Sequence, residues 1–227
     1  MKKIFLVDDH PMLRAGLARL IEEKPGCHVC GEAQTAAEAF EEIPLLQPDM
    51  IVMDISLPDK NGLELIKDLN SIISGIPILV FSMHDEMLYA ERVIRAGAKG
   101  YLMKGVATEK LNAAIDCVLG GGLYLSHHVS NHILNTLSTK RNDGKVGQVG
   151  IERLSDREIE IFELIGRGKS NTQIAEQLHI SPRTVDAHRC NIKSKLALTD
   201  APSLMREAVL WIELADRIPR EPGVAAR

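Results

Sequence analysis

Short apolar runs alternate with longer amphipathic segments over residues 1–125. A strand is predicted where about four to eight mostly apolar residues follow one another, and a helix where apolar residues recur every three or four positions. Leu13, Leu17 and Leu20 follow the helical spacing in the first amphipathic segment. The predicted strands are Lys3–Asp8, His28–Ala33, Met50–Asp54, Ile76–Ser82 and Gly100–Lys104, and the predicted helices are Pro11–Glu23, Ala36–Leu46, Leu63–Ile73, Glu86–Ala96 and Thr108–Leu119.

Strands that alternate with helices along a chain predict a parallel sheet. The helical crossovers between such strands are right-handed and cover both faces of the sheet. Residues 1–125 are therefore predicted to form an α/β domain, a doubly wound (βα)5 unit. In this class of fold the binding site lies at the carboxyl ends of the strands, where the strand order reverses.

A second, all-α domain is predicted after a polar linker. Helical periodicity fades over residues 126–150, where Lys, Arg, Asn, Asp and Gly cluster. Residues 151–216 carry helical signals only, including capping boxes that begin at Ser155 and Ser170. Residues 217–227 are predicted to be a frayed tail.

Composition and charge distinguish the two halves of the chain. Of 227 residues, 45% are hydrophobic and 26% are charged, which excludes a disordered or fibrous chain. Residues 1–125 carry 12 basic and 18 acidic residues, whereas residues 167–195 carry six basic and two acidic ones. Such a basic surplus suits contact with phosphates, although scattered basic residues more often form a solvated face.

The sequence also bears on the compartment in which the protein works. No apolar run approaches the roughly 18 residues of a membrane span, and the N-terminal apolar run ends at Asp8. We therefore expect a cytoplasmic protein without a membrane partner. Its four scattered cysteines are expected to be reduced thiols: Cys27, Cys30, Cys117 and Cys190.

Acidic, hydroxyl and basic residues are predicted to meet at the carboxyl edge of the sheet. Asp8 and Asp9 end the first strand and Asp54 the third, while Ser82 and Lys104 end the fourth and fifth. Clustered carboxylates repel one another unless a cation neutralises them, and their hard oxygens suit Mg²⁺. A carboxylate beside Mg²⁺ can act as a nucleophile toward a phosphoryl group. A single acid after a strand is more often a helix N-cap, so the prediction depends on the group.

Three stretches of residues 1–125 resemble the flavodoxin-like receiver domain of bacterial response regulators. They are Val7-Asp8-Asp9-His10, residues 53–62 (MDISLPDKNG) and residues 96–104 (AGAKGYLMK). The resemblance implies that Asp54 is the phosphoacceptor. It also implies Mg²⁺ ligation by Asp8, Asp9, Asp54 and the backbone carbonyl of Ser56, and a switch formed by Ser82, Tyr101 and Lys104.

Some positions near this site depart from the common receiver pattern. Gly105 follows Lys104 where many receivers have proline, and Met83 stands where a small residue often leaves room for phosphate. Ser56 and His84 flank the predicted phosphoacceptor. We expect such positions to set the lifetime of an aspartyl phosphate.

The helical domain carries the pattern of a DNA-reading motif. A three-residue turn at His179–Ser181 joins a helix at Thr172–Leu178 to one at Pro182–Leu196. If Val185 and Ile192 pack inward, the opposite face of the last helix presents small and basic residues, as a major groove requires. The alternative is a three-helix bundle with an ordinary charged surface.

The helical domain also resembles the LuxR-type helix-turn-helix, and the whole chain is similar to the NarL/FixJ family of response regulators. The resemblance rests on Leu154–Glu158, Gly168–Ala175, Ser181–His188 and Asn191–Leu196. It implies that Lys169, Thr184, Arg189, Lys193 and Lys195 lie near DNA phosphates and that Asp186, Ala187 and Cys190 lie near base edges. His188 is expected to pack inward, and a last helix at Ser203–Ala215 is expected either to close the core or to form a dimer seam.

These features together predict a transcription regulator of a two-component system rather than an enzyme. A sensor histidine kinase or a small phosphodonor is expected to phosphorylate Asp54. The added charge is expected to repack the receiver surface and to release or dimerise the helix-turn-helix, as a homodimer on double-stranded promoter DNA. The alternatives are a receiver-type regulator controlled without phosphorylation and a hydrolase that uses Asp54 as nucleophile, for which Ser56 is a poor general acid.

Overall fold

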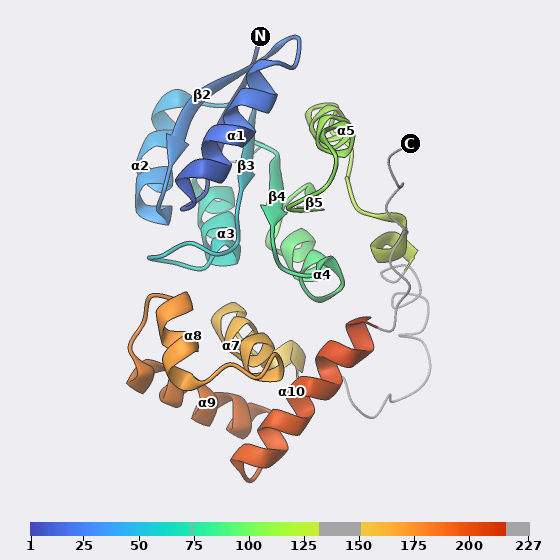
Figure 1. Cartoon of the computed structure of the whole chain (residues 1–227). Helices are drawn as coiled ribbons and strands as arrows, with labels where there is room; N and C mark the ends of the chain where they lie inside the picture. The colour runs from blue at the N-terminus through green and yellow to red at the C-terminus, as the bar shows by residue number, and fades with distance from the viewer. Residues whose placement is uncertain (74, 132–150, 217–227) are drawn as a thin grey trace. The chain divides into compact units, whose positions relative to one another are not determined.

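The computed structural model describes residues 1–73, 75–131 and 151–216, which divide into two compact units at residues 1–133 and 134–227. The predicted linker from residue 132 onward and the predicted tail at 217–227 lie outside the described residues. Each unit is described by itself (Figure 1). In the described parts of the chain, no helix has the length and apolar character needed to cross a bilayer.

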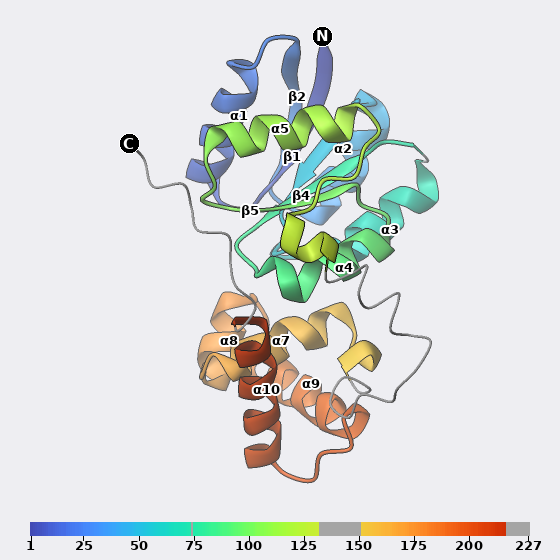
Figure 2. The same cartoon turned by 90° about the vertical axis from the view of Figure 1, so that its right-hand side faces the viewer.

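The first unit is a five-stranded parallel sheet with helices on both faces (Figures 1 and 2). The strand order is β2-β1-β3-β4-β5, so β1 is where the order reverses. The α/β doubly wound fold predicted from the sequence is therefore confirmed. The strands are β1 (Lys2–Val7), β2 (Cys27–Ala33), β3 (Met50–Met53), β4 (Ile78–Ser82) and β5 (Gly100–Met103), and the helices are α1 (Pro11–Glu22), α2 (Ala36–Leu46), α3 (Gly62–Ile72), α4 (Glu86–Ala96) and α5 (Thr108–Leu119).

The sheet is stabilised by apolar side chains on both faces. Helices α1 and α5 share one face, where Leu17, Ile21 and Ile115 pack against strand residues such as Ile4 and Val52. Helices α2, α3 and α4 cover the other face (Figure 1). Since the central strands are buried on both sides, their sequences are continuous apolar runs, which is why the pattern located them.

Two local details of the sheet were not predicted. Strand β4 begins at Ile78 rather than Ile76, because Pro77 has no N–H to donate to a neighbouring strand. Beyond α5, Tyr124 pairs with the edge of β5: its carbonyl accepts from the Tyr101 N–H at 2.9 Å, and its N–H donates to the Lys99 carbonyl at 2.9 Å. The start of the connection between the two units is thereby fixed to β5.

The second unit is helical, as predicted. A short 3₁₀ turn η1 (Ile151–Arg153) leads to α7 (Asp156–Gly166), α8 (Asn171–Gln177), α9 (Pro182–Lys195) and α10 (Ala201–Asp216). Ser155 and Ser170 both form complete capping boxes, and the Ser181 hydroxyl accepts from the Thr184 N–H at 3.1 Å. Val185 and Ile192 of α9 are fully buried, so the opposite face of α9 is exposed as expected.

Helix α10 packs against α7. Leu204 and Ala208 are fully buried, and the ring centroids of Trp211 and of Phe162 in α7 are 5.5 Å apart. A Cβ at Gly166 would lie 2.5 Å from the Ala208 carbonyl oxygen, so this close approach requires glycine. Core closure thus accounts for the inner face of α10, while Met205 and Leu210 remain exposed.

Candidate functional site

Three of the predicted site residues converge at the carboxyl edge of the sheet. Asp8 follows β1, Asp54 follows β3 and Lys104 follows β5. The Lys104 ammonium nitrogen lies 2.7 Å from an oxygen of Asp8 and 2.7 Å from an oxygen of Asp54, and none of the three side chains is more than 3% exposed. A buried ammonium therefore bridges the two carboxylates.

The charge balance of this cluster keeps Lys104 protonated. Burial is the largest single influence on the Lys104 pKa and lowers it, but attraction to Asp54 and Asp8 outweighs burial and raises the pKa overall. One positive charge thus faces two buried carboxylates, with Asp9 beside them as a third acid. The cluster retains excess negative charge that a bound cation can neutralise.

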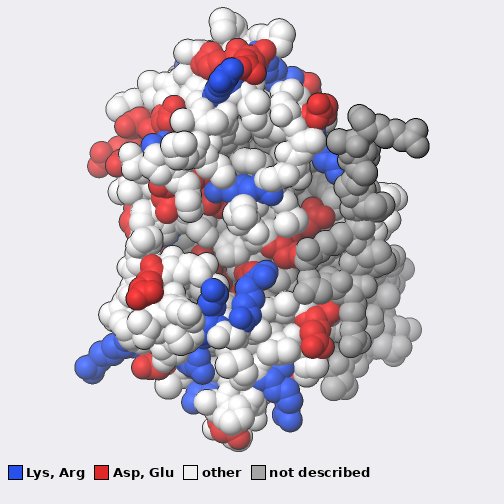
Figure 3. Space-filling model, in the orientation of Figure 1, with Lys and Arg blue, Asp and Glu red and all other residues white. Residues whose placement is uncertain are grey.

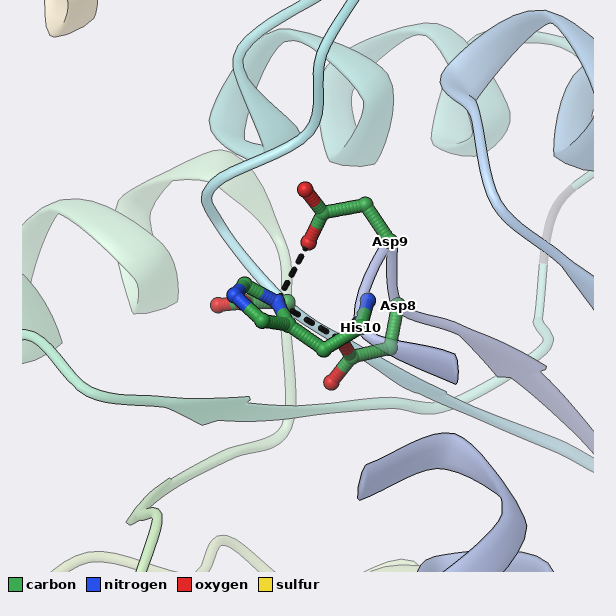
Figure 4. Close-up of side chains that lie close together, drawn as sticks. Asp8, Asp9 and His10 are labelled. Atoms are coloured by element: carbon green, nitrogen blue, oxygen red, sulfur yellow. Dashed lines mark hydrogen bonds and ion pairs between the residues drawn. The ribbon is translucent and has the colours of Figure 1, made fainter. Parts of the chain in front are cut away.

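Asp9 and His10 complete the cluster (Figure 4). The Oδ1 atom of Asp9 is buried, and its ion-pair partner, His10 Nδ1, lies 2.6 Å away. Ligand atoms of Asp8, Asp9, His10 and Asp54 all lie within 4.8 Å of one another. The cluster therefore brings together hard carboxylate oxygens from three side chains, which are the ligands that Mg²⁺ prefers, so the residues present suit the cation that the sequence predicts. Sequence reasoning did not identify His10 as a member of this group.

The backbone fixes Asp54 from several sides. Its N–H donates to the Val7 carbonyl at 2.9 Å, and its Oδ1 accepts from the Ile55 N–H at 2.6 Å. The start of α3 lies so close that a Cβ at Gly62 would be 2.5 Å from the Asp54 carbonyl oxygen. The phosphoacceptor predicted from the sequence is therefore held rigidly. One of its carboxylate oxygens accepts the Ile55 N–H, and the other pairs with the Lys104 ammonium.

The loops after β3 and β4 meet beside Asp54. Ser82 is fully buried, and Tyr101 is 1% exposed with its hydroxyl donating to the His84 carbonyl at 2.9 Å. The Ser56 hydroxyl and His84 Nε2 are 2.9 Å apart. The backbone carbonyl of Ser56 remains a predicted metal ligand. The Tyr101 ring thus occupies an inward position, and His84 connects it to the loop that follows the phosphoacceptor.

The second candidate site is the outer face of α9. Thr184, Asp186, Ala187 and Cys190 are exposed, as is Lys169 in the turn before α8, while Arg189 and Lys193 are half-buried. Figure 3 shows Lys and Arg side chains on the surface of the helical unit. Five of the eight predicted DNA-contacting residues are therefore exposed, four of them on α9.

Two residues of this surface are linked through α8. The Asn171 amide nitrogen donates to the Asp186 carboxylate, and the Arg189 guanidinium donates to the Asn171 amide oxygen at 3.1 Å. Asn171 therefore fixes the orientation of one acidic and one basic side chain. In the sequence, Asn171 belongs to the capping box that begins at Ser170 and to the Gly168–Ala175 stretch, and neither pattern predicted this role.

Lys195 and His188 lie toward the interior of the helical unit. Lys195 Nζ lies 2.6 Å from Glu158 in the first turn of α7. Burial raises the Glu158 pKa, but the Lys195 charge and the Ser155 N–H outweigh it and hold the pKa below its usual value. His188 is half-buried, and desolvation lowers its pKa. Lys195 is therefore less accessible to a phosphate than Lys169.

Comparisons with known proteins match both units. Residues 4–116 match the family described as response regulator receiver domain, and residues 152–208 match bacterial regulatory proteins of the luxR family. The transcriptional regulatory protein DegU of Brevibacillus brevis is 30% identical over 225 residues, covering 93% of this chain and 95% of DegU.

Two further relatives extend this picture. The oxygen regulatory protein NreC of Staphylococcus carnosus is 32% identical over 209 residues, covering 91% of this chain and 96% of NreC. A crystal structure of a two-component response regulator of the LuxR family from Aurantimonas sp. SI85-9A1 is 36% identical with a TM-score of 0.57, and the match covers 61% of this chain and 99% of that chain. The two sequence relatives therefore match this chain over nearly its whole length.

Proposed function

Because the chain belongs to the NarL/FixJ family of DNA-binding two-component response regulators, we propose that phosphorylation of Asp54 controls its binding to promoter DNA. The phosphodonor in this proposal is a sensor histidine kinase or a small acyl phosphate. The observation that carries the proposal is that buried Lys104 bridges Asp8 and Asp54, with the buried Oδ1 atom of Asp9 beside them.

The proposed reaction at Asp54 is a phosphoryl transfer. A carboxylate oxygen of Asp54 attacks the phosphorus of a phosphohistidine, a P–O bond forms as the P–N bond breaks, and solvent protonates the leaving nitrogen. Asp8, Asp9, Asp54 and the Ser56 carbonyl would hold Mg²⁺, whose positive charge would stabilise the phosphoryl oxygens. Lys104 lies 2.7 Å from Asp54 and is placed to pair with the new negative charge.

The proposed signal then passes from Asp54 to the surface of the receiver unit. Ser82 ends β4, the strand beside β3, and is fully buried, so its hydroxyl is a neutral donor suited to a phosphoryl oxygen. Tyr101 lies on β5, and its N–H donates to the Tyr124 carbonyl at 2.9 Å, at the start of the connection to the helical unit. A shift of Ser82 and Tyr101 would therefore displace that connection.

In the proposed DNA complex, α9 lies in the major groove. Lys169, Thr184, Arg189 and Lys193 contact phosphates, and Lys195 does so only by exchanging Glu158 for a phosphate. Base edges are read by Asp186, Ala187 and Cys190, and the carboxylate of Asp186 suits a cytosine amino group. We place the protein in the cytoplasm, where promoter DNA lies, and assign the DNA-bound form as a homodimer.

Asn171→Ala is expected to weaken promoter binding and reduce sequence preference. The substitution removes the hydrogen bonds that orient Asp186 and Arg189. Loss of such bonds at a partly exposed position is expected to cost about 1 kcal/mol of binding free energy, which is roughly a fivefold rise in the Kd for the promoter. The check is a titration of promoter and unrelated DNA by anisotropy, with Gln177→Ala, an exposed change at the end of the same helix, as control. Equal affinities of N171A and the wild-type protein for the promoter would exclude this orienting role.

The phosphorylation step itself is tested on the full chain. Incubation with Mg²⁺ and acetyl phosphate, followed by intact mass spectrometry, is expected to show one added phosphoryl group. An absence of any adduct, with Mg²⁺ and the phosphodonor in excess, would favour the alternative of a regulator controlled without phosphorylation.

A further inference from the structure

We infer that Arg14 is a positioning residue for the metal site, because its guanidinium fixes the peptide group between Asp8 and Asp9 and so holds both carboxylates in place for Mg²⁺. The Arg14 Nη1 atom donates to the Asp8 carbonyl oxygen at 2.5 Å. This inference rests on the proposed use of Mg²⁺ at Asp54 and adds a residue that lies outside the acidic cluster.

The Arg14 side chain is buried between α1 and the ends of two strands. A buried arginine requires partners for its charge and its N–H donors. Arg14 lies in the first turn of α1, and its Nε donates to Glu32 Oε2 in β2 at 2.9 Å. Strand β2 is the neighbour of β1, which Asp8 follows. One guanidinium therefore joins α1, β2 and the end of β1.

The carbonyl that Arg14 holds belongs to the peptide group that joins Asp8 to Asp9. Because a peptide group is planar, a fixed carbonyl oxygen also fixes the path of the chain from Asp8 to Asp9. Asp8 has further support, since its N–H donates to the Ala33 carbonyl at 3.1 Å and its Oδ1 accepts the His10 N–H at 2.9 Å. The Asp9 side chain is 22% exposed, against 3% for Asp8. The position of Asp9 therefore depends most on the backbone that Arg14 fixes.

Charge and position predict opposite effects of removing Arg14. The guanidinium is a positive charge close to residues that would hold a cation, so Coulomb repulsion alone predicts that its removal strengthens Mg²⁺ binding. Loss of the fixed peptide group predicts weaker binding, because groups outside the ligand set orient the ligands for the metal. The direction in which the Kd for Mg²⁺ changes therefore distinguishes the two effects.

The experiment measures Mg²⁺ binding to the full chain by isothermal titration calorimetry at constant ionic strength, with Mg²⁺ alone as the ligand. Arg14→Met removes the guanidinium and keeps an unbranched stem. It is expected to raise the Kd about 10-fold, the lower end of the range for residues that orient metal ligands. Arg19→Met is the matched control, because Arg19 lies in the same helix, is 81% exposed and pairs with Glu23 at 2.8 Å. R19M is expected to keep the wild-type Kd.

A second variant keeps the positive charge. Arg14→Lys has one nitrogen in place of the planar fork that reaches both Asp8 and Glu32. Its Kd for Mg²⁺ is expected to lie between those of the wild-type protein and R14M. Circular dichroism checks that each variant is folded, and R14K carries the test if R14M is not. A wild-type Kd in R14K would overturn the inference, because charge alone would then suffice.

Phosphorylation provides a second measurement on the same variants. The fraction of protein that acetyl phosphate modifies is measured against Mg²⁺ concentration by intact mass spectrometry. R14M is expected to need about 10-fold more Mg²⁺ for half-maximal modification and to reach the wild-type plateau, because Asp54 keeps its bond to Lys104. A lower plateau at an unchanged half-maximal Mg²⁺ concentration would indicate a merely structural role and overturn the inference.

The outcomes separate the inference from the proposed function. If the wild-type protein is phosphorylated but R14M binds Mg²⁺ as tightly as the wild-type protein, or more tightly, the inference alone is overturned. If the wild-type protein binds no Mg²⁺, the inference also fails. If R14M weakens Mg²⁺ binding but the wild-type protein forms no adduct, the proposed phosphorylation fails and the role of Arg14 at the metal site stands.

Discussion

Replacing Asp54 by Asn is expected to abolish the phosphate adduct that the full chain forms with Mg²⁺ and acetyl phosphate. The amide keeps the size of the side chain and its acceptor for the Ile55 N–H, which lies 2.6 Å from Oδ1 in the wild-type protein. It removes the nucleophilic carboxylate of Asp54. In the cluster, Asp8 is then the one remaining buried carboxylate in contact with Lys104. Intact mass spectrometry measures the loss directly.

The matched control for this variant is Asp59→Asn. The Asp59 carboxylate accepts the Ala36 and Ala37 N–H groups at 2.8 and 2.9 Å, at the start of α2, and takes no part in the acidic cluster. D59N is expected to form the adduct to the wild-type extent. If the same fraction of D54N as of the wild-type protein carried the adduct, the modification would lie on another residue, and the assignment would be contradicted.

Lys104→Met is expected to destabilise the receiver unit strongly when Mg²⁺ is absent. The methionine keeps an unbranched stem but leaves the Asp8 and Asp54 carboxylates buried without the ammonium that lies 2.7 Å from each. Removing one partner of a buried ionic group costs about 3 kcal/mol in the free energy of unfolding. Mg²⁺ is expected to restore part of this loss, because it binds the folded acidic cluster and supplies the missing positive charge.

The measurement is urea unfolding at neutral pH, followed by circular dichroism, with and without Mg²⁺. Lys2→Met is the control, because Lys2 pairs with Asp49 at 3.0 Å on the surface, where the side chains are 55% and 33% exposed. Such a pair contributes at most about 1 kcal/mol. Equal stabilities of K104M and K2M would contradict the claim that Lys104 balances a buried carboxylate cluster.

The fold was predictable because the relevant signals are local. Each buried strand of the parallel sheet is a continuous apolar run. Ser155 and Ser170 each begin a four-residue capping box, which marks the start of a helix. The convergence of Asp8, Asp54 and Lys104 was also predictable, since parallel strands end at one edge of a sheet. These predictions required no knowledge of how individual side chains pair.

The features that sequence reasoning missed depend on pairing across the fold. Asn171 and Asp186 are 15 residues apart and Lys195 and Glu158 are 37 residues apart, and no periodic pattern shows that they bond. The docking of Tyr124 on β5 also lies beyond the reach of periodicity, because it is a single bridge outside any strand. Ser56 and His84 were recognised as flanking the site, but only the structure shows that their side chains bond across it.

The central claim is that phosphorylation of Asp54 controls promoter binding by the helical unit. Genomic footprinting with the purified full chain, before and after treatment with Mg²⁺ and acetyl phosphate, tests it most directly. We predict that protection of specific sites appears or strengthens on phosphorylation, and that D54N shows no such change under the same treatment. Identical protection patterns for phosphorylated and untreated wild-type protein would contradict the account.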